Sequence, residues 1–421
     1  MRLWCFLRYL IARLTFFALR LPISRFEREI SELWRSTPEE RKKRLDETLK
    51  SNSPRGENGE RVSSVAQLVE QRPLTKSVFR ESASNAPKRA SGYSRHTAGT
   101  TGDPTHIFLS REELARMLAV RSYCYRYHGI RLGHREARIW GRAANTFASK
   151  IRDFLLNRKV FYPAESNAKD MVSDLVSWKP QYVYGYTSLI LEAAQIIEKN
   201  GFQPEGVKAV ICTAESILPA QKRFISSAFG APVLEEYGST EFDIIAFECK
   251  KGHLHLVNPW LWVESEYDSA LITDISRNSQ SLVRYKLGDA FKTVESNCEL
   301  LGGTRVIEEL QGRTAQQFAY LTPEHKFHAV VFGRALDAYM NEFHECFKFT
   351  VSQTEMGEFQ LYVSSSPSHG TDHLKNWVNL ELRAQLNEQL DLIRTVNAGE
   401  DVMRNGKHTY FFQDLDIDVN G

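Results

Sequence analysis

Hydrophobic and polar residues follow two different periods along the first half of the chain. Apolar residues recur at three- and four-residue spacing in "SREELARMLAVRSYCYRYHG" (110–129) and "SLILEAAQIIEKNG" (188–201), which predicts two helices, the second ending at Gly201. Short apolar runs at "QYVYGYT" (181–187) and "VKAVICTAE" (207–215) predict buried strands. Strands that alternate with helices in this way predict an α/β sheet.

The pattern changes twice in the second half of the chain. Residues 244–310 contain shorter apolar runs, which indicate a β-rich subdomain. From about residue 318 we expect the order strand, helix, strand, strand, helix, strand. Within it, "KFTVSQTEMGEFQLYVSS" (348–365) predicts a hairpin and "LKNWVNLELRAQLNEQLDL" (374–392) a helix. The pattern therefore predicts a separate, small α+β domain at the end of the chain.

The N-terminal residues 1–50 predict helices, followed by a polar loop at 51–60. Ser36, with Glu39 and Glu40 behind it, predicts the start of a helix.

The first 22 residues are apolar but carry interrupting arginines, Arg8, Arg13 and Arg20. The unbroken apolar runs are too short for a signal peptide or a bilayer-spanning helix. Two interpretations remain: a helix packed on the body of the protein, which we favour, or an amphipathic helix on an anionic membrane surface.

The composition bears on two questions: whether the protein binds nucleic acid and in which compartment it works. The 421 residues include 54 Lys and Arg against 52 Asp and Glu, a net charge of +2, so no general attraction to nucleic acid is expected. The six cysteines contain no CxxC pair, which indicates a reducing compartment and hence a cytoplasmic protein.

The segment "HTAGTTGDPT" (96–105) is too rich in glycine and threonine for a regular helix or strand. Glycines let the backbone approach an anion, and successive N–H groups together with threonine hydroxyls can bind phosphate. The lysine of a kinase-type phosphate loop is missing between Gly99 and Thr105. Taken alone, the segment is either a phosphate loop or a flexible surface loop.

Four later segments favour the phosphate loop over the flexible surface loop. Together with residues 97–105, they resemble, in order and spacing, the sequence motifs of the adenylate-forming superfamily of acyl- and aryl-CoA synthetases. The five segments are "TAGTTGDPT" (97–105), "EYGSTE" (236–241), "RYKLGD" (284–289), "LQGRT" (310–314) and "RNGKHTYF" (404–411). The resemblance covers roughly residues 60–421 and is greatest to the phenylacetate-CoA ligase-like branch, especially members associated with capsule or polysaccharide biosynthesis; Thr105 fits that branch.

The resemblance implies a fold class and a domain division. The fold would be α/β, with a large N-terminal adenylate-forming domain that includes the β-rich subdomain, and a small, mobile α+β C-terminal domain. We expect a helical, amphipathic segment and loop at 1–60, the ATP- and acid-binding domain at 61–313, and the C-terminal domain at 314–421.

The resemblance also assigns nucleotide-binding roles. The β- and γ-phosphates would be held by Thr97, Gly99, Thr100, Thr101 and Gly102. Tyr237 and Gly238 would lie along the adenine, with Ala214 and Glu215 on its other side. Asp289 would accept hydrogen bonds from the ribose hydroxyls, and Arg313 would reach the ribose or phosphate from the domain boundary. Acidic residues usually follow that arginine in the family, whereas this chain has Thr314, Ala315, Gln316 and Gln317.

Three residues would act on the reaction itself. Thr240 would lie near the α-phosphate, and Glu241 would hold Mg²⁺, for which a hard carboxylate is suited. Lys407 would bridge the carboxylate and the α-phosphate when the C-terminal domain closes. Each has an ordinary structural alternative, such as a turn residue or a solvated lysine.

The implied activity is ATP-dependent activation of a carboxylic acid to an acyl-adenylate, with release of pyrophosphate. The acyl group would then pass to a thiol of CoA or of a carrier protein. An amine of a sugar or amino acid is the alternative acceptor, and a non-catalytic, membrane-associated scaffold is the alternative class of function. The acid pocket is expected between about 125 and 240, where Trp140, Phe147, Tyr184 and Tyr186 are either lining or core.

One further cluster suggests metal binding. "ECKKGHLH" (248–255) places Cys249, His253 and His255 close together, with Cys298 downstream, and zinc favours four such ligands. The two histidines, however, could point to opposite faces of a strand. We therefore favour buried cysteines with surface histidines and expect no zinc.

Overall fold

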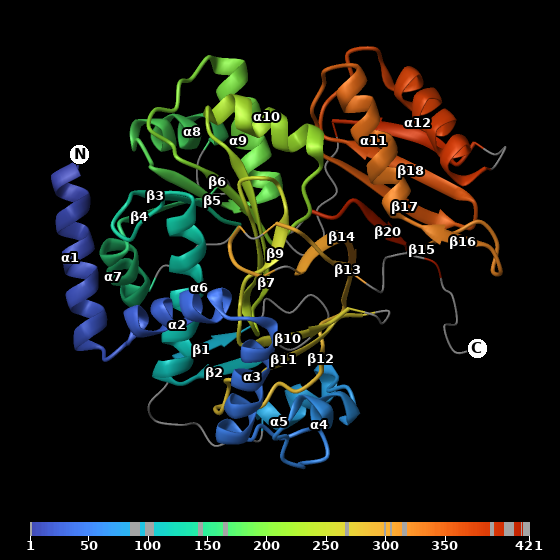
Figure 1. Ribbon diagram of the computed structural model, residues 1–421. Helices are drawn as coiled ribbons and strands as arrows, with labels where there is room; N and C mark the ends of the chain where they lie inside the picture. Colours follow the sequence, from blue (N-terminus) through green and yellow to red (C-terminus); the bar gives the residue numbers. More distant parts are fainter. Residues whose placement is uncertain are drawn as a thin grey trace.

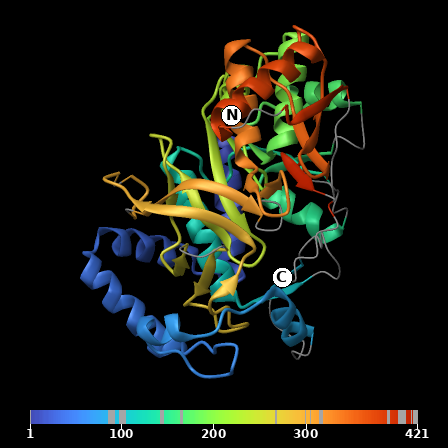
Figure 2. The ribbon, with the colours of Figure 1, turned by 90° about the vertical axis from the view of Figure 1, so that its right-hand side faces the viewer.

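The computed structural model describes residues 2–84, 93–96, 105–141, 146–162, 167–265, 269–298, 300–303, 305–313, 318–387, 391–399, 408–413 and 415. Figures 1 and 2 show these residues as a large unit with a smaller unit on one side. In this part of the chain, no helix is both long and apolar enough to cross a membrane.

Within the described residues, five helices precede the first strand, and the first three confirm the prediction of helices at residues 1–50. They are α1 (Arg2–Ala18), α2 (Ile23–Arg35), α3 (Pro38–Asn52), α4 (Val65–Glu70) and α5 (Lys76–Ser84). Helix α2 buries Ile23, Phe26 and Ile30 against the large unit, whereas α1 lies along its outer edge (Figure 1).

Helix α3 starts one residue later than predicted. Thr37 is its N-cap, with the Thr37 side chain accepting from the Glu40 N–H while the Glu40 carboxylate accepts from the Thr37 N–H. Pro38 occupies the first helical position, where its fixed φ and missing N–H are tolerated. Ser36 instead ends α2.

A nine-stranded sheet in the order β13-β14-β9-β8-β7-β6-β5-β3-β4 forms the centre of the large unit. The strands β3 to β7 pair in parallel with their neighbours, and the rest of the sheet is antiparallel. The parallel strands are β3 (Glu136–Ile139), β4 (Arg158–Phe161), β5 (Tyr182–Tyr186), β6 (Val210–Thr213) and β7 (Val233–Ser239). The others are β8 (Asp243–Glu248), β9 (Leu254–Leu256), β13 (Asp289–Glu295) and β14 (Arg305–Arg313).

Helices cover both faces of the parallel half, as expected where the strands are apolar on both sides. The covering helices are α6 (Arg111–Tyr127), α7 (Phe147–Leu155), α8 (Ala168–Ser177), α9 (Thr187–Asn200) and α10 (Pro219–Phe229). In β5, Val183 packs into the core beneath α8 to α10, and its neighbours Tyr182 and Tyr184 pack into the core beneath α2 and α6. Gly201 ends α9 in the left-handed conformation, as predicted.

Shorter strands make up the β-rich part. The strands β10 (Leu261–Glu264), β11 (Leu271–Asp274) and β12 (Tyr285–Lys286) form one antiparallel sheet. The strands β1 (Tyr93–His96) and β2 (His106–Leu109) pair as a hairpin.

The smaller unit has its own hydrophobic core, built around Phe332, Tyr339 and Phe359. It comprises β15 (Phe318–Tyr320), β16 (Lys326–His328), α11 (Val330–Glu342), β17 (Phe349–Glu355), β18 (Glu358–Val363), α12 (Thr371–Leu386), β19 (Ile393–Ala398) and β20 (Phe411–Gln413). The predicted hairpin is β17–β18, within a sheet ordered β19-β18-β17-β20. The fold class is thus confirmed as a large α/β part with a β-rich portion and a small α+β part.

The two units meet at α10. The first turn of α10 donates the Ala220 N–H to the Asp337 carboxylate of α11 at 2.8 Å, and a carboxylate at a helix N-terminus is favourable. Gln221 donates to the Phe347 carbonyl at 3.2 Å, and Tyr410 donates to Gln221 at 2.7 Å. Figures 1 and 2 both show the smaller unit, in orange and red, beside the green helices of the large unit.

Candidate active site

A cleft of about 3200 Å³ lies at the carboxyl ends of the parallel strands and is lined by residues of both units. Ligands of open α/β sheets commonly bind at this edge. The large unit contributes the residues that follow β6 and end β7, and the smaller unit contributes Asp337 and Tyr410.

Ala214 and Glu215, which follow β6, both line the cleft. Ala214 has a left-handed backbone with φ of +67°, a conformation that costs a residue with a Cβ about 1–2 kcal/mol. Strained backbone of this kind is concentrated at ligand sites. The Glu215 carboxylate accepts the Ser188 N–H and the His408 N–H, both at 2.8 Å. It therefore joins the start of α9 to the C-terminal segment.

Tyr237 and Gly238, at the end of β7, meet Asp289 at the start of β13. The Tyr237 hydroxyl donates to the Asp289 carboxylate at 3.0 Å, and all three residues line the cleft. A Cβ on Gly238 would lie 2.0 Å from the Asp243 carbonyl oxygen, so glycine is required here by the neighbouring strand. Two of the segments that suggested the resemblance are thus in direct contact.

Thr240 and Glu241 differ in their exposure to the cleft. Thr240 lines it, whereas Glu241 is buried, and its carboxylate accepts the Tyr285 hydroxyl at 3.1 Å. Among the described residues, Glu241 is not part of the cleft lining.

Several residues named from the sequence lie outside the described part of the chain: Thr97, Gly99, Thr100, Thr101, Gly102 and Lys407. Arg313 is the last residue of β14, but its side chain is likewise outside the description. Residues that flank both segments are described. His96 pairs with His106 in the β1–β2 hairpin. His408, which follows Lys407, bonds to Glu215 in the cleft.

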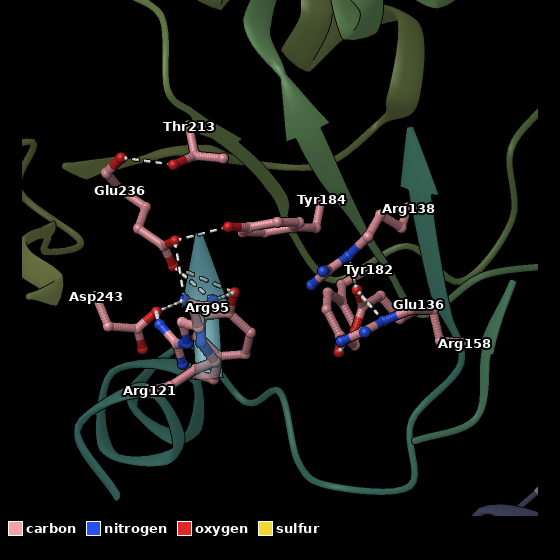
Figure 3. Close-up of polar contacts among 11 residues, drawn as sticks. Arg95, Arg121, Glu136, Arg138, Arg158, Tyr182, Tyr184, Thr213, Glu236 and Asp243 are labelled. Carbon is pink, nitrogen blue, oxygen red and sulfur yellow. Dashed lines mark hydrogen bonds and ion pairs between the residues drawn. The ribbon is translucent and has the colours of Figure 1, made fainter. Parts of the chain in front are cut away.

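Sequence reasoning missed a charged network on the cleft wall (Figure 3). Arg121 of α6 pairs with Glu236 at 3.0 Å and with Asp243 at 3.1 Å, and Tyr184 donates to Glu236 at 2.9 Å. Burial raises the pKa of Glu236 above its ordinary value, although Arg121 opposes this effect. Burial would also raise the pKa of Asp243, but the charges of Arg121 and Arg95 outweigh it and lower that pKa.

A second network surrounds Glu136 of β3 (Figure 3). Its carboxylate accepts from Arg138 and Arg158, each at 2.7 Å, and from the Tyr182 hydroxyl at 2.7 Å. Burial alone would raise the pKa of Glu136, but the two guanidinium groups and their hydrogen bonds lower it to about 2. No local sequence signal marks Arg121 or Arg158, because each is one arginine in an ordinary helix or strand.

Of the aromatic residues named for the acid pocket, three line the cleft. Trp140 lies beside Tyr184, with ring centroids 5.9 Å apart and nearly parallel planes, and beside Tyr186 at 4.2 Å. Phe147 is 80% exposed and is not part of the described cleft lining, so both expected alternatives, pocket lining and core, are wrong for it. It starts α7 and points away from the sheet core.

The cysteine–histidine cluster is assembled in the structure. The ligand atoms of Cys249, His253, His255 and Cys298 all lie within 4.8 Å of one another. The expectation that the two histidines face opposite ways is wrong, because residues two apart in a strand share a face. His253 also precedes β9 rather than lying within it.

Comparisons with known proteins agree with this architecture. No family model matches the chain. Protein CapK of Staphylococcus aureus is 24% identical over 208 residues, 46% of this chain and 46% of that protein. Indoleacetate–lysine synthetase of Pseudomonas savastanoi is 35% identical over 120 residues, 27% of this chain and 30% of that protein. The chain thus spans less than half the length of the curated relatives it matches.

The structural likeness extends further. A 2-hydroxyisobutyryl-CoA ligase, in the postadenylation state in complex with R3-HIB-AMP, superposes with a TM-score of 0.65 at 16% identity, over 93% of this chain and 88% of that chain. The amide bond synthetase McbA from Marinactinospora thermotolerans superposes with a TM-score of 0.52 at 11% identity, over 75% and 66%. At these identities the likeness establishes the fold, and it is the fold that the five sequence motifs indicated.

Proposed function

We propose that this chain, which has the fold of the adenylate-forming ligases, uses ATP to convert a carboxylic acid to an acyl-adenylate. The observation that carries the proposal is the contact between Tyr237 and Asp289. These residues come from two motifs 52 residues apart and meet by a 3.0 Å hydrogen bond in the large cleft. The roles of the individual residues are those that the resemblance implies.

In the first step, a carboxylate oxygen of the acid attacks the α-phosphorus of ATP. The new oxygen–phosphorus bond gives the acyl-adenylate, while the bond from the α-phosphorus to the bridging oxygen of the β-phosphate breaks and pyrophosphate leaves. Asp289 would accept the ribose hydroxyls, with Tyr237 along the adenine and Ala214 and Glu215 opposite. Residues Thr97, Gly99, Thr100, Thr101 and Gly102 would hold the β- and γ-phosphates. Arg313 would reach the nucleotide from the end of β14.

Thr240 would donate its hydroxyl near the α-phosphate, and Lys407 would bring a positive charge from the smaller unit. Glu241 would hold Mg²⁺, since a hard carboxylate oxygen suits this ion; its carboxylate, which is buried against the Tyr285 hydroxyl in the structure, would have to reach the cleft to do so. When bound, the ion neutralises phosphate charge. We retain 61–313 and 314–421 as the proposed domains, with closure of the second completing the site.

In the second step, a nucleophile attacks the acyl carbon and AMP leaves. We propose a thiol, of CoA or of a carrier protein, as the acceptor. An amine of an amino acid or sugar is the second candidate, favoured by the 35% identity over 120 residues to a protein named as a lysine synthetase. Mass spectrometry of reactions that contain ATP, acid and either CoA or lysine separates the two: a thioester supports the first and an amide the second.

A non-catalytic scaffold remains the rival class of function. A scaffold has no need for the Tyr237–Asp289 contact at the cleft, whereas a nucleotide-binding enzyme does. Acid-dependent exchange of labelled pyrophosphate into ATP tests the enzyme directly, because exchange requires reversible formation of the acyl-adenylate. No exchange across a broad panel of acids would favour the scaffold.

We also propose that α1 contacts an anionic membrane surface from the cytoplasmic side. Arg8 anchors α1 to α7, since its guanidinium donates to the Phe154 carbonyl at 2.8 Å. This anchoring leaves Leu14 and Phe17 of α1 at 67% and 83% exposure, with Arg13 also exposed on the helix. Large exposed apolar side chains with basic neighbours are typical of helices that lie in a membrane interface.

A further inference from the structure

We propose that Cys249, His253, His255 and Cys298 bind one zinc ion that stabilises the fold and takes no part in the reaction. This site is separate from the nucleotide chemistry proposed above and does not depend on it. It would join the turn between β8 and β9 to the loop that connects β13 and β14.

The separation of the two sulfur atoms fits a tetrahedral zinc site. Cys249 Sγ and Cys298 Sγ are 3.9 Å apart. Two sulfurs bound at about 2.3 Å to one tetrahedral zinc lie about 3.8 Å apart. A disulfide would require about 2.05 Å, so both thiols are free in the structure. The imidazole nitrogens complete a set of four ligand atoms within 4.8 Å of one another.

His255 is oriented as a metal ligand. It is fully buried, and its Nδ1 lies 2.9 Å from the Gly303 carbonyl, so Nδ1 carries the proton and donates it. Its Nε2 is buried, and within the described part of the chain it has no hydrogen-bond partner. A buried nitrogen without a partner is unfavourable, and a metal ion would satisfy it. A carbonyl on one ring nitrogen and a metal on the other is the usual arrangement of a zinc-bound histidine.

The turn around Cys249 also suits a thiolate. Gly252, with φ of +83°, allows the chain to reverse, and Cys249 and His253 are joined by a backbone hydrogen bond of 2.9 Å. The Lys251 N–H points at Cys249 Sγ at 3.3 Å. Such a contact stabilises negative charge on sulfur. Two thiolates and two neutral imidazoles would balance the charge of Zn²⁺, so the ion could be buried.

The position of the site explains what zinc would do. Cys298 lies in the loop between β13 and β14, and β13 begins with Asp289 in the cleft. Gly302 and Gly303 of the same loop pack directly against Trp34 of α2. A zinc ion here would hold together the β13–β14 hairpin, the β8–β9 turn and the N-terminal helices. With four protein ligands it would have no open position for substrate, as in structural zinc sites.

The first test measures metal in the full-length protein purified without chelators from zinc-supplemented cells. We expect one zinc per chain by inductively coupled plasma mass spectrometry. Cys298→Ser and His253→Ala should each lose most of that zinc, and His253 is the least buried of the four, so its variant should fold. Cys124→Ser is the matched control, since Cys124 is buried outside the cluster, and it should retain zinc. Equal zinc in all variants would overturn the proposal.

The second test uses the wild-type chain alone. After zinc is stripped, Co²⁺ should bind once per chain and give the visible and near-ultraviolet bands of tetrahedral cobalt–thiolate coordination. The thermal midpoint should rise on reloading with zinc, by several degrees. A wild-type protein that neither contains zinc nor takes up Co²⁺ with this spectrum would contradict the site. All these readouts are independent of ligase activity, so failure of the proposed reaction would leave them unaffected.

Discussion

The hydroxyl of Tyr237 donates a 3.0 Å hydrogen bond to the carboxylate of Asp289 and ties the end of β7 to the start of β13. Tyr237 also packs edge-on against Phe291, with ring centroids 5.4 Å apart. The carboxylate is therefore held in a fixed place at the cleft. This is the position from which it would accept the ribose hydroxyls of ATP.

Asp289→Ala should weaken ATP binding more than it slows the adenylation step. The ribose hydroxyls lie several bonds from the reacting phosphorus, so the contact is nearly the same in ground and transition states and its loss mainly raises KM. Hydrogen bonds to a charged group contribute about 1.5–3 kcal/mol each, which predicts an affinity loss of roughly two orders of magnitude or more. KM for ATP and for 2′-deoxy-ATP, measured for the wild type and for Asp289→Ala, tests this prediction. If wild type and variant are equally sensitive to the missing hydroxyl, Asp289 is only a turn residue.

Lys407→Ala should greatly lower the adenylation rate and leave the affinity for ATP unchanged. The lysine precedes His408, whose N–H bonds to Glu215 at 2.8 Å in the cleft, whereas the nucleotide would bind mainly to the large unit. Single-turnover adenylation rates beside equilibrium ATP affinity measure this. Lys326→Ala, at an exposed residue of β16, is the control and should behave like wild type. An adenylation rate near wild type for Lys407→Ala would remove the lysine from the mechanism.

Glu136→Gln should destabilise the protein in a pH-dependent manner. The pKa of Glu136 is about 2 in the folded protein against 4.5 ordinarily. Its ionised form therefore stabilises the fold above about pH 4.5, and this stabilisation disappears as the pH falls towards 2. The difference between the two pKa values corresponds to about 3 kcal/mol.

Denaturant unfolding at several pH values tests this prediction. The wild type should exceed Glu136→Gln in unfolding free energy at pH 7, and the gap should shrink in acid. Glu205→Gln, which removes an exposed carboxylate paired with Lys179, is the control and should show no comparable gap. A gap that stays constant with pH would show that packing, not charge, is lost.

Leu14→Glu with Phe17→Glu should abolish binding to anionic liposomes and leave adenylation unchanged. Both side chains are exposed on α1, so the substitutions should not disturb the core. Leu380→Glu, at 59% exposure on α12 in the smaller unit, is the matched control. Co-sedimentation should separate the α1 variant from wild type and from Leu380→Glu. If all three partition alike, α1 is not a membrane contact.

The sequence was sufficient for the fold because periodicity and motif order are local signals. The strand–helix alternation predicted the α/β sheet. The resemblance carried by "EYGSTE" and "RYKLGD" implied a common nucleotide site, and Tyr237 and Asp289 are in contact in the structure. The capping of α3 was misplaced by one residue, since Ser36 and Thr37 are both good N-caps and Pro38 decides between them.

Other features depend on contacts between distant segments. Arg121 of α6 meets Glu236 and Asp243 only because α6 packs under β7 and β8, and nothing near residue 121 indicates this. Cys298 is 49 residues from Cys249, and the sheet order β8-β9-β14-β13 brings them together. Such a cluster can be suspected from composition, but its geometry comes from the sheet.

The most direct test of the central claim is acid-dependent exchange of labelled pyrophosphate into ATP by the full-length protein. With Mg²⁺ and a panel of carboxylic acids, at least one acid should support exchange well above the acid-free rate. Asp289→Ala should show less exchange at low ATP and recover in part at high ATP, since binding is what it loses. Exchange that is absent with every acid, or that is identical in wild type and Asp289→Ala at all ATP concentrations, would contradict acyl-adenylate formation at this site.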